Sequence, residues 1–201
     1  MADISAAVVR ELRERTGVGM MDCKKALVEA GGDLDAAVRL LREKGEKLAD
    51  KRAGRATSEG LVHSYIHAGG RIGVLVEVNC ETDFVARTDQ FRSLCRDLAM
   101  QVAANAQTRG VTPDDLPSDV VQAERDILSK QALAEGKPAA VVEKMVEGRL
   151  KKFYEEACLL EQPFIKDDKK TVGEVVKETI AATGENIQVR RFARFQLGEA
   201  G

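Results

Sequence analysis

The sequence predicts an α+β protein that begins with a small bundle of helices. Residues 4–44 carry apolar side chains at helical spacing, and glycines interrupt the pattern. Three later stretches alternate apolar and polar residues, which is typical of half-buried strands. Most of the remaining chain returns to helical spacing. We therefore expect an N-terminal three-helix unit, then a core with a three-stranded, mainly antiparallel sheet, covering helices and a helical hairpin.

Composition and charge narrow the class of protein. The chain has 201 residues, of which 44% are hydrophobic and 32% charged, a balance typical of globular domains. Its net charge of -2 argues against a protein that binds nucleic acid by neutralising phosphates. The start has an acid where a signal peptide needs basic residues, and no apolar run reaches membrane-spanning length. We expect a cytoplasmic protein that makes no membrane contact.

Three short helices are predicted within residues 1–45, which we expect to form a separate domain. Gly17 ends the first, Gly31 and Gly32 end the second, and Asp33 caps the third, which stops near Gly45. The apolar stripes predicted for these helices comprise Val8, Val9 and Leu12, then Met21, Leu27 and Ala30, then Leu34, Ala37, Val38 and Leu41.

The turn between the first two helices, Gly17-Val-Gly-Met-Met21, allows two interpretations. A dinucleotide site is disfavoured, because no strand precedes the glycines and the later glycine of that motif is missing. Core filling is the ordinary role of Met20 and Met21. Neighbouring helical positions point in different directions, however, so at least one of them should be exposed.

Residues 46–57 form a polar, basic connector, which we interpret as a solvated linker helix. An arm that binds nucleic acid is the alternative. Acidic residues at Glu46, Asp50 and Glu59 interrupt the basic charge and disfavour it.

The core is predicted to span residues 58–201. Residues 60–67 and 71–79 are expected to form a hairpin around Ala68-Gly69-Gly70, and residues 187–197 a third strand. One face of the second strand would carry Ile72, Val74, Val76 and Val78. One face of the third would carry Ile187, Val189, Ala193, Phe195 and Leu197, with Phe192 on the other.

The hairpin runs into the segment Thr82-Asp-Phe-Val85. Thr82 or Asp83 could cap a helix. Phe84 is either a core residue or an aromatic side chain presented to a partner. Residue type alone favours burial, since large apolar side chains are usually inside.

Helices are predicted for most of the remaining core. Thr88 or Asp89 would cap the helix that contains Phe91. A hairpin of two antiparallel helices is expected at about residues 118–157, with Ser118 as its first cap and Gly136-Lys-Pro138 as its turn. Thr171 and Glu174 fit a capping box for a last helix, which Gly184 would end.

The cysteines and histidines do not suggest a metal or a catalytic site. Cys23, Cys80, Cys95 and Cys158 include no Cys-x-x-Cys pair, so four free, mostly buried thiols and no cofactor are expected. His63 and His67 lie on a predicted strand about 13 Å apart, too far to share a metal. A hydrolase using Cys80 or Cys95 with either histidine is disfavoured, because no spacing provides a nucleophile, a base and an orienting group.

Three motifs identify a family. The segments are Asn79-Cys-Glu-Thr-Asp-Phe-Val-Ala-Arg87, Leu12-Arg-Glu-Arg-Thr-Gly-Val-Gly-Met-Met-Asp-Cys-Lys-Lys-Ala-Leu27, and Gly136-Lys-Pro138 with Lys144-Met-Val-Glu-Gly-Arg-Leu-Lys-Lys-Phe153. Over essentially its whole length the chain resembles the bacterial elongation factor Ts family, the nucleotide exchange factors of elongation factor Tu.

The resemblance implies a fold and a partner. Residues 1–45 would form a ubiquitin-associated (UBA-like) domain, and the hairpin would be a partner-contact arm. Some members of the family carry two related core subdomains, whereas short members such as this chain form a homodimer. Elongation factor Tu would be the partner, with no covalent chemistry, no enzyme activity of the chain itself and no direct nucleic-acid contact. The alternative is an RNA- or ribosome-binding protein that uses the three helices and the basic connector.

The resemblance also implies residue roles. Four residues would displace Mg²⁺ from elongation factor Tu: Thr82, Asp83, Phe84 and Val85. Five would dock on its G domain: Leu12, Arg13, Met20, Met21 and Lys24. His67, at the hairpin tip, is a further candidate contact, and its ordinary interpretation is an exposed turn residue.

Overall fold

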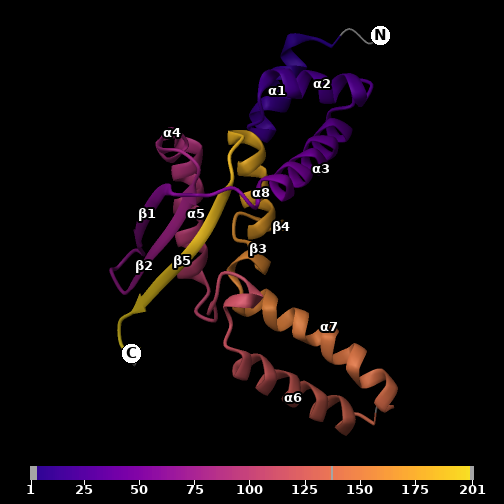
Figure 1. Ribbon diagram of the computed structural model, residues 1–201, viewed down its shortest axis with the longest axis vertical. Helices are drawn as coiled ribbons and strands as arrows, with labels where there is room; N and C mark the ends of the chain where they lie inside the picture. Colours follow the sequence, from indigo (N-terminus) through magenta and orange to yellow (C-terminus); the bar gives the residue numbers. More distant parts are fainter. Residues whose placement is uncertain (1–3, 137, 200–201) are drawn as a thin grey trace. The chain divides into compact units, whose positions relative to one another are not determined.

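The computed structural model describes residues 4–136 and 138–199. Within these ranges it contains eight α-helices, a three-stranded sheet in the order β1-β2-β5 and a two-stranded sheet, which confirms the α+β class (Figure 1). The chain forms two compact units. The first comprises the chain up to His63 with residues 76–97 and 174–190, and the second comprises residues 64–75 and 98–173 with the chain from Arg191 onward.

The N-terminal helices are α1 (Ala6–Thr16), α2 (Met20–Glu29) and α3 (Leu34–Arg52). Gly17 ends α1 in the left-handed conformation, and the Asp33 side chain caps α3 by accepting from the Ala36 N–H, as predicted. The three helices share one apolar cluster made of Val9, Leu12, Cys23, Ala26, Leu27, Ala37 and Leu41.

The prediction that α3 ends near Gly45 is wrong, because the helix continues to Arg52. Gly45 is buried, and a Cβ added there would lie 2.9 Å from Cβ of Ala181 in α8 (Val172–Thr183). The glycine therefore allows two helices to pack closely instead of stopping one. Arg42 also forms an ion pair with Glu174, which fastens α3 to α8 a second time.

The main sheet begins with a hairpin of β1 (Glu59–Ile66) and β2 (Ile72–Cys80). At its tip the His67 N–H donates to the Ile72 carbonyl at 2.9 Å, and Gly69 and Gly70 have positive φ. Val74, Val76 and Val78 are buried, as the alternation predicts. In Figure 1, β5 (Ile187–Gln196) runs beside β2 in the opposite direction.

The facing predicted for β5 is only partly correct. Ile187 and Val189 are buried, but Arg190 and Arg191 are both exposed and Phe192 is half-buried. Phe195 is 67% exposed, so the prediction that it shares the buried face of Ile187 is wrong. Two consecutive exposed residues, Arg190 and Arg191, change which alternate positions of the strand are buried. The exposed apolar side chains of β5 thus belong to the face opposite Phe192.

The remaining helices of the described chain include α4 (Asp83–Ala86) and α5 (Asp89–Ala104). The hydroxyl of Thr88 accepts from the Phe91 N–H, so Thr88 caps α5. Short elements complete the core: the 3₁₀ turns η1 (Pro113–Asp115) and η2 (Leu159–Glu161), and the strands β3 (Pro163–Phe164) and β4 (Asp167–Thr171).

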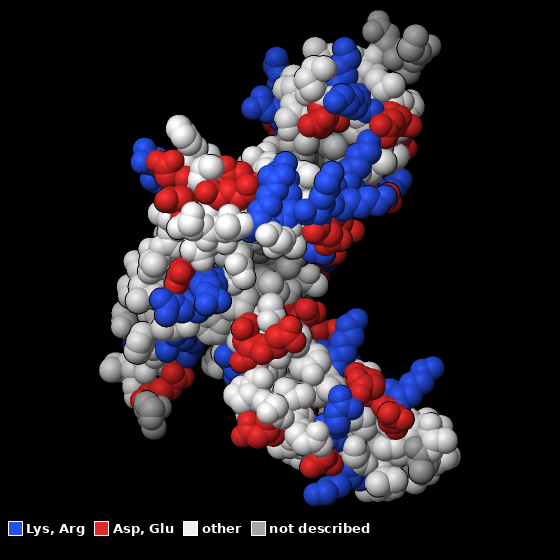
Figure 2. Space-filling view, viewed as in Figure 1, with Lys and Arg blue, Asp and Glu red and all other residues white. Residues whose placement is uncertain are grey.

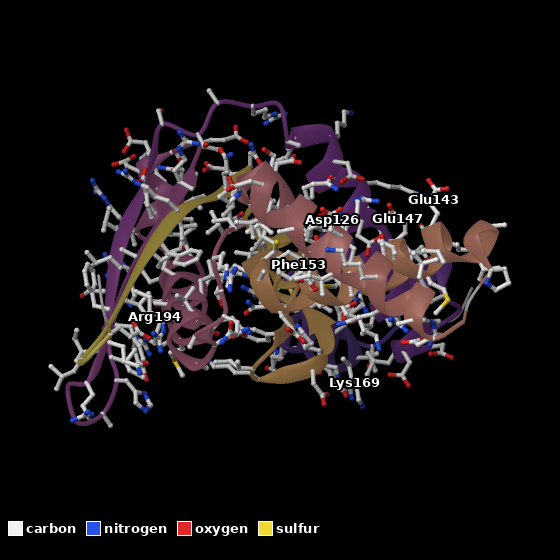
Figure 3. All side chains as sticks on the ribbon, turned by 90° about the horizontal axis from the view of Figure 1, so that it is seen from below. Asp126, Glu143, Glu147, Phe153, Lys169 and Arg194 are labelled. Atoms are coloured by element: carbon white, nitrogen blue, oxygen red, sulfur yellow. The ribbon has the colours of Figure 1, made fainter. Side chains whose placement is uncertain are left out.

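The predicted helical hairpin is confirmed as α6 (Ser118–Ala134) and α7 (Ala139–Ala157). Its seam buries Leu128, Ala132, Val142, Val146 and Leu150. Ser118 is the first residue of α6 and not its cap, which is Pro117. Glu147 forms an ion pair with Arg125 across the hairpin, and Figure 3 shows Glu147, Glu143 and Asp126 on these two helices.

Candidate partner-binding site

The segment Thr82–Val85, which we name the wedge loop, follows β2 and opens α4. Thr82 is the cap: its hydroxyl accepts from the Val85 N–H at 3.4 Å, and its backbone is extended. Asp83 is the first helical residue, and its carboxylate pairs with Arg87 one turn later at 2.8 Å. The sequence allows either Thr82 or Asp83 as the helix cap, and the structure shows that the cap is Thr82.

The side chain of Phe84 is 80% exposed, so the interpretation of Phe84 as a core residue is wrong. The next two residues, Val85 and Ala86, are 8% and 5% exposed. One short helical turn therefore anchors itself through Val85 and Ala86 while it presents an aromatic ring to solvent. Exposed aromatic side chains on an anchored support are typical of binding hot spots.

The base of the wedge loop is held from below by the end of β2. Cys80 is fully buried there, and its thiol donates to the Thr82 carbonyl at 3.1 Å. All four cysteines are free and buried, as predicted. Burial raises the pKa of the Cys80 thiol to about 11 and that of Cys95 to about 12. Protonated, buried thiols are poor nucleophiles at neutral pH, so nothing in this geometry favours a cysteine hydrolase.

The predicted docking residues divide into buried and exposed positions. Leu12 is fully buried in the cluster of the N-terminal helices, so its side chain packs inside the domain, and its docking role stays a prediction. Arg13 and Lys24 are exposed. Met20 and Met21 are 40% and 66% exposed, which confirms that at least one methionine points outward.

Met21 was also predicted to line the core of α2, and that part is wrong. The buried stripe of α2 consists of Cys23, Ala26 and Leu27. Cys23 fills the position that the pattern gave to Met21, since a cysteine packs as a small apolar residue. The four exposed candidates are Arg13 on α1 and Met20, Met21 and Lys24 on α2, and we name this set the docking face. It combines two basic residues with two adaptable apolar ones.

His67 is exposed at the tip of the β1–β2 hairpin, in the second unit, and its Nδ1 lies 3.0 Å from the Tyr65 hydroxyl. This agrees with its ordinary interpretation as an exposed turn residue. His63 is half-buried on β1, and burial, then the charge of Arg96, lowers its pKa. The parts of the chain that the structure describes contain no cluster of three metal-binding side chains.

Charge is distributed unevenly around these elements. Figure 2 shows Lys and Arg side chains gathered over α3 and Asp and Glu side chains gathered near α4. Several of the basic residues of α3 are paired with acids, such as Lys44 with Glu29 and Arg42 with Glu174. Paired charges weaken the attraction for phosphates that the nucleic-acid alternative needs.

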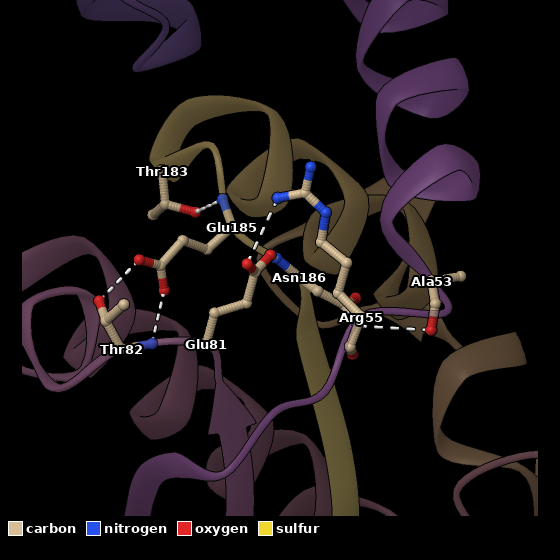
Figure 4. Close-up of polar contacts among 7 residues, drawn as sticks. All are labelled: Ala53, Arg55, Glu81, Thr82, Thr183, Glu185 and Asn186. Atoms are coloured by element: carbon tan, nitrogen blue, oxygen red, sulfur yellow. Dashed lines mark hydrogen bonds and ion pairs between the residues drawn. The ribbon is translucent and has the colours of Figure 1, made fainter.

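A polar network at the base of the wedge loop was not foreseen from the sequence (Figure 4). The Glu185 carboxylate accepts from the Thr82 N–H at 3.0 Å and from the Thr82 hydroxyl at 2.6 Å. In return, the Glu81 carboxylate accepts from the Asn186 N–H at 2.7 Å. The bonded residues are more than 100 positions apart in the chain, so no local sequence pattern predicts the contact.

Comparison with known proteins agrees with this architecture. Residues 6–199 match the family described as Elongation factor TS. A protein of Desulforamulus reducens named Elongation factor Ts is 61% identical over 199 residues, which cover 99% of this chain and 91% of that protein. Proteins with the same name from Carboxydothermus hydrogenoformans and Moorella thermoacetica are 62% and 61% identical over 196 residues, or 98% of this chain and 90% and 96% of theirs.

Proposed function

Because this chain belongs to the elongation factor Ts family, whose members are translation elongation factors, we propose that it is the nucleotide exchange factor of elongation factor Tu. It would bind the GDP form, displace Mg²⁺ and promote GDP release so that GTP can enter. The observation that carries the proposal is the 80% exposed ring of Phe84 on an anchored helical turn.

The mechanism needs no covalent step. A GTPase holds GDP through its phosphate loop and a Mg²⁺ ion that bridges to the phosphates. An exchange factor lowers GDP affinity only if it binds the nucleotide-free partner more tightly than the GDP form. Phe84, inserted between elements that support the ion, would shift them. Thr82 and Val85 would hold the loop, and Asp83, oriented by Arg87, would bond the partner's backbone.

Two narrower predictions, on domain organisation and on location, accompany this proposal. We retain a UBA-like N-terminal domain, a core at residues 58–201 and the cytoplasmic location. The boundary at residue 45 and the separate linker helix at 46–57 are corrected, because α3 runs unbroken from Leu34 to Arg52 and residues 53–57 are not helical. In the described ranges, no helix is both long and apolar enough to cross a membrane.

Reciprocal binding tests the proposed function. Calorimetry should show that the chain binds nucleotide-free elongation factor Tu more tightly than the GDP form. GDP should weaken binding of the chain by the same factor by which the chain weakens GDP, as linkage requires. Equal affinity for the two forms, or salt-sensitive binding to RNA in place of elongation factor Tu, would contradict the proposal.

The docking face predicts a defect in binding. Replacing Arg13 by alanine should raise the concentration of the chain that half-saturates GDP release about fivefold, the effect of losing roughly 1 kcal/mol of contact. The limiting release rate should stay unchanged, because Arg13 lies outside the wedge loop. Arg39, an exposed arginine of α3, is the matched control. A lowered limiting rate in the Arg13→Ala variant would contradict the division between docking and wedge residues.

We further propose that the chain forms a homodimer. The Phe192 face of β5 is one possible seam, but Phe192 is half-buried, so we assign the seam to the opposite face. There, alternate positions of the sheet expose large apolar side chains: Ile66 at 66%, Leu75 at 45%, Phe195 at 67% and Leu197 at 65%. A second copy would cover this apolar face, which is unusual for a monomer's surface.

Ultracentrifugation tests the dimer. The unmodified chain should sediment as a dimer, and Phe195→Asp should sediment as a monomer, because a charge buried in an apolar interface lacks a partner. Val28→Asp, at a 54% exposed position of α2, should leave the dimer intact. A monomeric unmodified chain at micromolar concentration would remove the proposal.

A further inference from the structure

We propose that Glu185 is a positioning residue: together with Glu81 and Asn186 it clamps the base of the wedge loop and so fixes the direction in which Phe84 points. The inference rests on the proposed exchange function for its biological meaning. The contacts that define the clamp do not depend on that function.

The clamp consists of two carboxylates that act in opposite directions (Figure 4). Glu185, in the turn between α8 and β5, accepts both the N–H and the hydroxyl of Thr82. Glu81, next to the wedge loop, accepts the N–H of Asn186 in that same turn. Each segment thus supplies a carboxylate to the backbone of the other. Hydrogen bonds to ionised acceptors are roughly twice as strong as neutral ones. The two carboxylates therefore hold the base of the wedge loop firmly against the turn between α8 and β5.

The wedge loop needs such a restraint because little else orients the aromatic ring. Helix α4 has four residues, a length at which a helix is unstable in isolation. Phe84 itself is mostly exposed, so packing around the ring does little to select one direction. Its orientation therefore depends on the two ends of the turn: Val85 and Ala86 packed beneath it, and Thr82 held by Glu185.

A third segment joins the clamp. The Asn186 side chain donates to the Arg55 carbonyl at 2.9 Å and to the Ala53 carbonyl at 3.4 Å, just after the end of α3. The Arg55 guanidinium pairs with Glu81 at 3.3 Å. Hydrogen bonding from Asn186 first, and the bond to Arg55 after it, lower the pKa of Glu81, so this carboxylate stays ionised at neutral pH.

This third contact gives the clamp a mechanical role. Helix α3 carries the packing of the docking helices on one side and lies against α8 through Gly45 and Arg42. The turn after α8 then holds the wedge loop. The base of the wedge loop is thus connected, through α8 and α3, to the helices that carry the docking face. A partner bound to the docking face would therefore meet a wedge loop that is held in place by those helices. Without the clamp, we expect the partner still to bind the docking face, but we expect the Phe84 side chain to lose its fixed orientation.

A single tryptophan measures the order of the wedge directly. The chain contains no Trp, so Phe84→Trp places a unique fluorescent reporter at the tip. Time-resolved anisotropy of this variant should show a slowly reorienting indole, and adding Glu185→Gln should add a fast component of large amplitude. Glu81→Gln, which weakens the reciprocal bond, should do the same if the Glu185 variant folds poorly.

Asp115 provides a matched control. Its carboxylate accepts the N–H and the hydroxyl of Thr112 at 2.7 and 2.8 Å, the same pair of bonds that Glu185 makes, but in the second unit. Asp115→Asn should therefore remove similar bonds and leave the anisotropy of the indole reporter unchanged. A reporter that remains equally ordered in the Glu185 and Glu81 variants would overturn the proposal.

Kinetics then separate positioning from a general loss of stability. For this assay residue 84 is kept as phenylalanine. Glu185→Gln should then lower the limiting rate of GDP release from elongation factor Tu about tenfold, as expected for losing one or two charged hydrogen bonds. The half-saturating concentration should stay the same. A change confined to half-saturation would contradict the clamp. If the unmodified chain did not accelerate GDP release from elongation factor Tu, the proposed exchange function would be wrong. The anisotropy result would still show whether Glu185 and Glu81 order the wedge loop.

Discussion

Replacing Phe84 by alanine is expected to lower the limiting rate of GDP release about hundredfold, since a central aromatic contact contributes about 2–4 kcal/mol and each 1.4 kcal/mol is tenfold in rate. The loss should appear in the limiting rate because the ring acts only once the partner's ion-binding elements begin to move. Stopped-flow fluorescence of labelled GDP, at saturating concentrations of the chain, measures this rate.

The control for this variant is another exposed apolar residue outside the proposed contacts. Ile165 is 42% exposed, and Ile165→Ala should release GDP at the rate of the unmodified chain. Phe84→Ala should unfold at the same urea concentration as the unmodified chain, because an exposed ring contributes little to stability. A full release rate in a folded Phe84→Ala protein would rule out the wedge.

Replacing Gly60 by alanine is expected to destabilise the fold by about 3 kcal/mol or more, through overpacking and backbone strain together. Gly60 has φ +146°, and a Cβ there would lie 2.1 Å from the Val78 carbonyl oxygen and 2.7 Å from the Asn79 Cα. Both neighbours are backbone atoms of β2, so relief requires β1 to separate from β2. Urea denaturation followed by circular dichroism measures the free energy of unfolding.

Gly69 provides the comparison for Gly60. It also has positive φ, at +88°, but a Cβ there would meet no atom within 4 Å. Gly69→Ala isolates the conformational cost alone, which should be about 1–2 kcal/mol. Equal losses at the two positions would show that strain, and not the close approach of β2, explains the requirement for glycine at Gly60.

The parts of the fold that the sequence predicts well are those governed by local patterns. The alternation of Val74, Val76 and Val78 marks a strand with one buried face, and Asp33 and Thr88 cap the helices that follow them. Each of these depends on residues within one or two turns of each other. Local free-energy preferences are sufficient there, and the structure agrees with them.

The errors occur where distant segments meet. Gly45 would end a helix by local rules, but packing against Ala181 keeps it within one. The apolar alternation of β5 does not reveal the phase change in burial at Arg190 and Arg191. Burial of Phe84 was the favoured interpretation from residue type, and only the placement of Val85 and Ala86 beneath the helix turns the ring outward.

The clamp belongs to the same class of unpredictable contact. Glu185 looks like an ordinary polar residue after a helix, and Thr82 alone suffices to explain a helix cap. Their hydrogen bonds join positions 103 residues apart, and neither residue type demands the other. The resemblance to the family indicates the wedge loop itself, but it does not indicate the clamp residues Glu81, Glu185 and Asn186.

Release of labelled GDP from purified elongation factor Tu, with and without this chain, tests the exchange function most directly. If the chain is an exchange factor, release should accelerate with increasing concentration of the chain and saturate, and excess Mg²⁺ should oppose the acceleration. A release rate equal to the spontaneous rate, at concentrations where calorimetry shows the two proteins bound, would contradict it.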